Sequence, residues 1–167
     1  EVNYYLASGQ NDRLLESLDN AVNSDPNNPV LHLVLGNTYS QLGDIKKAED
    51  SYKQSILLDP NYFDSYYNLA SLYNNQTIIL IEEKNNLDYN QTKLFNKLNK
   101  KINDLYTIAV PYLEKCLQLD PTNSLVIDAL RKVYYNMDNA KASMDMKKLS
   151  ELPDSTKGAF VQEFFNQ

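Results

Sequence analysis

The sequence has 167 residues, of which 43% are hydrophobic, and a chain of this size can bury the core of one domain without disulfides. Its net charge of -6 disfavours a general binder of phosphate backbones, so we expect no nucleic-acid partner. The densest apolar stretch, Ile78 to Ile81, is far shorter than the roughly 20 residues of a membrane span, so we expect no membrane span either.

The chain repeats itself with a period of 34 residues that is interrupted once. Asp-Pro dipeptides follow at intervals of 34 and 61 residues, at Asp25, Asp59 and Asp120. Tyrosines keep the same intervals, at Tyr5, Tyr39, Tyr73 and Tyr134. We therefore divide a single domain, residues 1–167, into a partial repeat (1–28), a complete repeat (29–62), an interrupted repeat (63–123), a degenerate capping repeat (124–152) and a C-terminal tail (153–167).

Each repeat is predicted to be a pair of antiparallel helices. In the complete repeat, apolar residues spaced by three and four predict one helix over residues 31–42 and another over residues 48–57. Gly43 suits the end of the first helix, because glycine tolerates a left-handed backbone there. Pro60 ends the second helix, because proline disfavours helical geometry in the residue before it. The partial repeat keeps one complete helix, from about Asn11 to Ser24.

The interrupted repeat carries 27 extra residues, at about 76–104, between its two helices. Apolar residues continue at helical spacing on both sides, which predicts a helical arm that turns near Asp88 to Asn90. Proline removes a backbone donor, so we expect a kink or break near Pro111. Ile78 and Ile79 fall off the inward stripe and would be exposed unless another element covers them. The arm therefore either extends the core or docks a partner.

The C-terminal tail is predicted to form a short helix. Four apolar residues gather on one side of it: Phe160, Val161, Phe164 and Phe165. This side either folds onto the final repeat as a cap or is presented to a partner or to a second copy of the chain.

The complete repeat resembles the tetratricopeptide repeat (TPR) family, whose pattern is a bulky residue, Leu-Gly or Leu-Ala, Tyr, Ala, an aromatic, a small residue and Pro. Its eight positions are His32, Leu35, Gly36, Tyr39, Ala48, Tyr52, Ser55 and Pro60. The interruption resembles insertions in some bacterial TPR proteins. The final repeat departs from the pattern, with Arg131 where Gly or Ala is usual. The resemblance implies an all-α fold, a TPR α-solenoid of antiparallel helix hairpins stacked in a right-handed superhelix.

The sequence lacks the groups of nucleophilic, basic or metal-binding residues that a catalytic or metal site needs, so we expect no enzyme, no cofactor and no metal. The chain has one histidine, His32, and one cysteine, Cys116, and both fall at packing positions of the repeat. A zinc site would need several such residues at fixed spacing. The four glycines form no Gly-rich loop.

In the TPR family the first helices of the repeats line a concave groove that holds peptides. Carrying these positions over gives the candidate ligand-binding residues Asn37, Gln41, Tyr67, Asn68, Ser71, Asp128, Lys132 and Tyr135. Asn37 and Asn68 match two asparagines with which chaperone-binding TPRs hold a terminal carboxylate. Leu33, Leu125 and Ala129 stand where those proteins have Lys or Arg, so a chaperone tail is disfavoured. The resemblance thus implies a protein–protein interaction scaffold that binds a peptide or partner protein.

The alternative is a structural module that self-associates through the arm and the tail. Its homo-oligomer contacts would be Ile78, Ile79, Phe160, Phe164 and Phe165. The first residue is Glu1 rather than Met, and together with the bacterial resemblance of the insertion this favours a periplasmic or secreted location.

Overall fold

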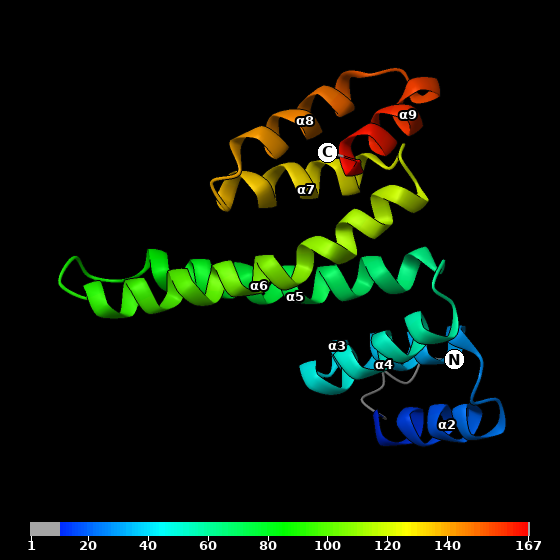
Figure 1. Ribbon diagram of the computed structural model, residues 1–167. Helices are drawn as coiled ribbons and strands as arrows, with labels where there is room; N and C mark the ends of the chain where they lie inside the picture. Colours follow the sequence, from blue (N-terminus) through cyan, green and yellow to red (C-terminus); the bar gives the residue numbers. More distant parts are fainter. Residues whose placement is uncertain (1–10, 167) are drawn as a thin grey trace. The chain divides into compact units, whose positions relative to one another are not determined.

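The computed structural model describes residues 11–166, and this part of the chain is all-α, with eight helices and no strand (Figure 1). Tyr5, the first tyrosine of the repeat pattern, lies outside the described residues. The chain divides into two compact units, with the boundary in the sequence between Leu69 and Ala70, and each is described separately below. The helices are α2 (Asn11–Ser24), α3 (Pro29–Gln41), α4 (Ile45–Leu58), α5 (Phe63–Asn85), α6 (Thr92–Leu119), α7 (Ser124–Asn136), α8 (Ala140–Glu151) and α9 (Asp154–Phe165).

In the first unit, α3 and α4 form a hairpin whose ends are set by local chemistry. Asn28 caps α3 by accepting a hydrogen bond from the Val30 N–H (3.0 Å), and Pro29 occupies the first helical position. Gly43 has a positive φ of 80°, the left-handed conformation that ends a helix without a Cβ clash. Asp44 then caps α4 through the Lys47 N–H (3.1 Å). These four residues explain why the expected hairpin forms.

The two helices of this hairpin approach closely at Gly36. A Cβ atom built on Gly36 would lie 2.6 Å from the ring of Tyr52, so the ring occupies the space that a side chain would fill. Tyr52 is buried, with 3% of its surface exposed. The residue before Gly36, Leu35, packs against Leu14 and Leu18 of α2. The glycine and tyrosine of the repeat motif are therefore a matched packing pair.

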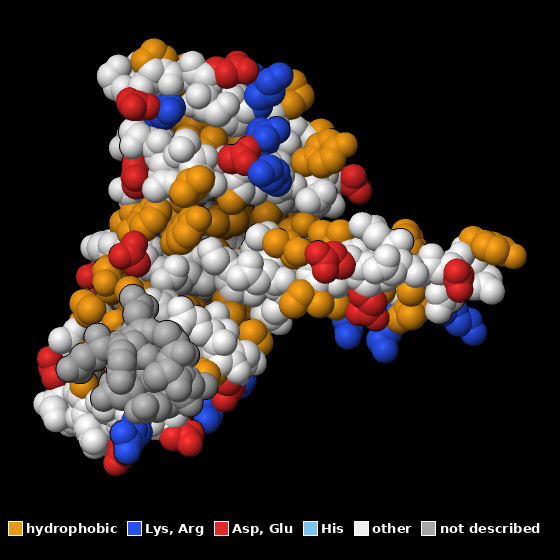
Figure 2. Space-filling model, turned by 180° about the vertical axis from the view of Figure 1, so that it is seen from behind, with side chains coloured by type: hydrophobic (Ala, Val, Ile, Leu, Met, Phe, Trp, Pro, Cys, Tyr) orange, Lys and Arg blue, Asp and Glu red, His pale blue; other side chains and the backbone are white. Residues whose placement is uncertain are grey.

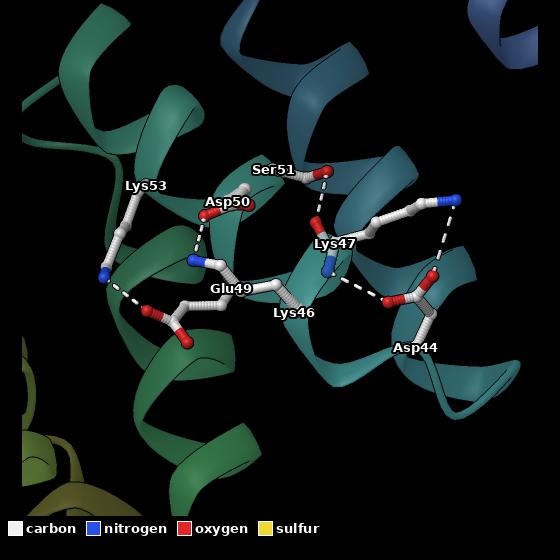
Figure 3. A network of polar contacts seen from close by, with 7 residues as sticks. All are labelled: Asp44, Lys46, Lys47, Glu49, Asp50, Ser51 and Lys53. Carbon is white, nitrogen blue, oxygen red and sulfur yellow. Dashed lines mark hydrogen bonds and ion pairs between the residues drawn. The ribbon is translucent and has the colours of Figure 1, made fainter.

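The outer face of α4 is polar. Ion pairs one turn apart join Lys46 to Asp50 (2.8 Å) and Lys53 to Glu49 (Figure 3). Exposed pairs of this kind add only about 0.3–0.5 kcal/mol each. This face is therefore a solvated surface and is the natural place for control substitutions.

In the second unit, α7 and α8 repeat the α3–α4 hairpin. Ser124 begins α7 95 positions after Pro29 begins α3, and both helices have 13 residues. Asn123 caps α7 as Asn28 caps α3, by accepting from the Val126 N–H (3.2 Å). Asp138, 95 positions after Gly43, has a positive φ of 57°. Equivalent positions therefore cap the first helix and adopt the left-handed backbone in both hairpins, although only the first hairpin has a glycine at the left-handed position.

The long helices α5 and α6 have 23 and 28 residues and run antiparallel where both lie in the second unit. Near the tip of this hairpin, Lys84 donates to Asn99 Oδ1 (3.1 Å), and near its base the rings of Tyr73 and Tyr112 stack with centroids 6.1 Å apart. Pro111 lies inside α6, which bends but is not broken (Figure 1). A kink, rather than a break, follows from the proline. The insertion itself stays an interpretation of the sequence.

The C-terminal helix α9 lies against α6 and α8. Val161 is 3% exposed, and the ring of Phe164 meets the ring of Tyr134 with centroids 6.4 Å apart. Phe160 and Phe165 are half-buried. The apolar side of α9 thus packs on its own unit, which favours the capping alternative for the tail.

Candidate functional site

The eight candidate residues divide between the two units. Four belong to the first unit: Asn37 and Gln41 on α3, and Tyr67 and Asn68 on the first turns of α5. The structure brings Asn37 and Asn68 together, because Asn68 Nδ2 donates to Asn37 Oδ1 (3.0 Å). The same Asn37 oxygen accepts a second hydrogen bond from the hydroxyl of Tyr52 (2.8 Å). The packing tyrosine therefore orients the candidate asparagine.

This network leaves the amide nitrogen of Asn37 and the amide oxygen of Asn68 available. In the part of the chain that the structure describes, Asn37 Nδ2 and Asn68 Oδ1 have no hydrogen-bond partner. Both side chains are only half-buried, so a ligand can reach them. A peptide group offers one C=O acceptor and one N–H donor, which matches this pair of side-chain amide groups.

Tyr52 keeps its proton at neutral pH. Burial raises the pKa of its hydroxyl above the ordinary value, and a hydrogen bond with Ser40 offsets part of that rise. The hydroxyl therefore remains the donor that holds Asn37 Oδ1. The orientation of the Asn37 amide follows from this donor and from Asn68.

Gln41 and Tyr67 flank the asparagines without joining their network. Gln41 is exposed at the end of α3. Tyr67 stacks on Phe63 of the same helix, with centroids 6.0 Å apart and an angle of 12° between the rings. The stacking holds the Tyr67 ring in one orientation, so a ligand that packs on this ring loses little side-chain entropy.

The other four candidates belong to the second unit: Ser71 on α5, half-buried, and Asp128, Lys132 and Tyr135 on α7. Asp128 forms ion pairs with both Lys132 (2.6 Å) and Arg131 (2.5 Å). Hydrogen bonds from these two cations hold the pKa of the Asp128 carboxyl below its ordinary value. Asp128 is thus occupied in positioning two basic side chains.

A hollow of about 220 Å³ lies beside these cations, between α7 and α8. Its lining residues are Arg131, Lys132, Tyr135, Asn136 and Ser143. Tyr135 is 74% exposed, a large aromatic surface with little cover. Arg131 was not among the candidates, although the sequence contains a signal for it. A long cation at a position where the repeat has Gly or Ala must reach the surface.

The single histidine and the single cysteine both have structural roles. His32 donates from Nε2 to the Pro26 carbonyl (2.9 Å), and Cys116 is fully buried. Leu33 is 7% exposed and so is part of the core rather than of a binding surface. Over residues 11–166, no cluster of three or more His, Cys, Asp or Glu could hold a metal ion. Over the same residues, no helix combines the length and the apolar character of a membrane span.

Comparison with known proteins identifies one segment of the chain. Residues 36–76, which run from α3 into α5, match a family model described as "TPR repeat". Among curated proteins, none matches this chain.

Two solved structures are similar at low identity. One, described as "MamA RS-1 ArsTM double mutant", has a TM-score of 0.41 and 16% sequence identity, with 99% of this chain and 93% of that chain covered. The other, described as "Functional Characterization of Pseudomonas Aeruginosa pilF", has a TM-score of 0.39 and 16% identity, with 99% and 81% covered. At these values neither informs the function of this chain.

Proposed function

Since this chain is a tetratricopeptide repeat protein, a class of protein-interaction scaffold, we propose that it binds an extended segment of another protein along the first helices of its repeats. We further propose that it does so without catalysing a reaction. The affinity would come from a few anchors on the repeat faces, as in most protein interfaces.

The observation that carries this proposal is the hydrogen bond between Asn37 and Asn68. It joins the first helices of two successive repeats through the side chains that the family pattern selects. The bond and the Tyr52 hydroxyl hold both amides in place before any ligand arrives, so binding costs little side-chain entropy. The remaining amide groups then bracket one peptide group of the ligand.

The second unit contributes a different kind of contact. Tyr135 offers an exposed aromatic face, and Lys132, whose side chain is 67% exposed, offers a positive charge next to it. We propose that Tyr135 packs on an apolar part of the ligand and that Lys132 pairs with an acidic group. Tyr67 plays the aromatic role in the first unit.

A peptide-library selection against the intact protein tests the proposal. We expect peptides that bind the native chain to lose at least about tenfold in affinity to Asn37→Ala, because the two amide bonds to one peptide group and the Asn68 link are lost together. Isothermal titration with one selected peptide measures the change.

Lys46→Ala, on the solvated outer face of α4, is the matched control and should leave the affinity unchanged. Equal affinities for the native chain, Asn37→Ala and Lys46→Ala would rule out the asparagine face as the binding site. Circular dichroism must first show that the variants keep the native helical signal.

A further inference from the structure

The α5–α6 hairpin has an apolar face with charges on its rim that nothing described so far explains. Residues spaced by three and four on both helices line a hollow of about 420 Å³ on this face. They are Gln76, Ile79 and Leu80 from α5, and Lys101, Asp104, Leu105 and Ile108 from α6. All of them belong to the second unit.

Several of these apolar side chains are open to solvent. Ile79 is 64% exposed, Ile108 is 45% exposed, and the neighbouring Ile78 is 47% exposed. The hairpin extends beyond α7 and α8, and hydrophobic side chains follow one another along it between acidic and basic ones (Figures 1 and 2). An exposed cluster of this kind on a helical hairpin marks an interaction surface.

The charges on this face indicate what covers it. Lys101 and Asp104 are exposed and lie about one turn apart on the same face of α6. Neither has an ion-pair partner among the residues that the structure describes. A surface with one positive and one negative group beside an apolar centre is complementary to itself, because a two-fold rotation brings each group opposite its counterpart.

We propose that this face docks a second copy of the chain, in an antiparallel pairing of the two α6 helices about a two-fold axis midway between Lys101 and Asp104. Each Lys101 then faces the Asp104 of the other copy. At a rise of about 1.5 Å per residue, Leu105 lies roughly 4 Å along the helix from this axis. The apolar groups of Leu105 and Ile79 from both copies therefore meet at the centre of the contact.

The first test is the mass of the native chain and of Ile79→Glu, measured by sedimentation equilibrium over a range of concentrations. We expect a reversible dimer for the native chain and a monomer for Ile79→Glu, because each copy would then bring an unpaired carboxylate into the apolar centre of the contact. A native chain that stays monomeric at every concentration overturns the proposal.

The second test uses the charges. Lys101→Asp alone and Asp104→Lys alone place like charges opposite each other, so each should dimerise at least about tenfold more weakly than the native chain. An equimolar mixture of the two variants places opposite charges at both positions and should form a heterodimer of native strength. The double variant Lys101→Asp/Asp104→Lys should also recover self-association.

Lys46→Asp is the matched control, because it changes the net charge as Lys101→Asp does but lies on the exposed face of α4, in the first unit rather than on the α5–α6 hairpin. It should dimerise like the native chain. Dimers that persist unchanged in Lys101→Asp, or a mixture that stays monomeric, overturn this pairing. A different protein that binds the hollow while the native chain remains monomeric overturns it as well.

Discussion

At the scale of single residues, Gly36 sets the distance between α3 and α4. The place of a Cβ atom lies 2.6 Å from Tyr52 ring atoms, and the ring cannot easily retreat because it is buried and its hydroxyl holds Asn37. Gly36→Ala should therefore lower the free energy of unfolding by about 1–2 kcal/mol, since overpacking costs more than the roughly 1 kcal/mol that alanine gains in a helix. Chemical denaturation measures the change.

Gly158→Ala is the control for this substitution. Gly158 also lies in a helix, α9, but nothing stands within 4 Å of the place of its Cβ atom. We expect this variant to be more stable than the native chain by about 0.5–1 kcal/mol. If both variants shift stability in the same direction, the close approach at Gly36 does not limit the packing.

A second residue, Tyr134, makes the stability of the fold sensitive to alkaline pH. Burial raises the pKa of its hydroxyl well above 10, and the hydrogen bond to Glu114 and the charge of that carboxylate raise it further. The unfolded chain releases this proton near pH 10 while the folded chain retains it. The stabilisation is therefore complete below pH 10 and is lost as the pH rises above 10.

Tyr134→Phe should make the stability fall less steeply above pH 10. It should also cost about 1–3 kcal/mol at neutral pH, because Glu114 loses its hydrogen-bond donor. A residual slope is expected from Tyr52 and Tyr106, since burial raises the pKa of both. Denaturation curves from pH 7 to pH 11 measure both effects. Tyr89→Phe, at a 99% exposed residue, is the comparison, and an identical slope in both variants would contradict this account.

At the scale of elements, α9 closes the end of the second unit. Its buried side depends on Val161, which is 3% exposed, whereas Ala159 on the same helix is exposed. Val161→Asp places a charge in an apolar contact and should cost more than about 2 kcal/mol. Hydrogen exchange should then show faster amide exchange throughout α9.

Ala159→Asp adds the same charge on the solvent side of α9 and should leave the exchange rates of the helix as they are. Slow exchange of α9 in both variants would show that the helix does not depend on its apolar side. The result also bears on the tail phenylalanines, because a docked α9 leaves them little surface for contacts between copies.

At the scale of the whole molecule, local patterns predict the helices well and side-chain partners poorly. The bounds of α2 and the glycine that ends α3 follow from residues close in sequence, so period and composition are sufficient. The Asn37–Asn68 bond joins residues 31 positions apart on different helices. The repeat pattern assigns both to one face but does not show that Asn68 and the Tyr52 hydroxyl donate to the same oxygen of Asn37.

The repeat pattern also does not predict features that depend on contacts with other helices. The pattern treats Arg131 only as a departure, because its use depends on the hollow that α8 forms beside it. The packing of Val161 depends on α6 and α8 together, so the sequence favours the cap but leaves the exposed tail open as an alternative. The ligand-binding role of the eight candidate residues stays a prediction.

The measurement that tests the central proposal most directly is the NMR spectrum of the side-chain amides during titration with a selected peptide. We predict that the Asn37 and Asn68 amide resonances shift in proportion to the fraction bound, while backbone resonances of the outer face of α4 stay in place. Saturation of the peptide with unchanged Asn37 and Asn68 resonances, and shifts confined to α4 or α8, would contradict the proposal that the first helices of the repeats bind the partner.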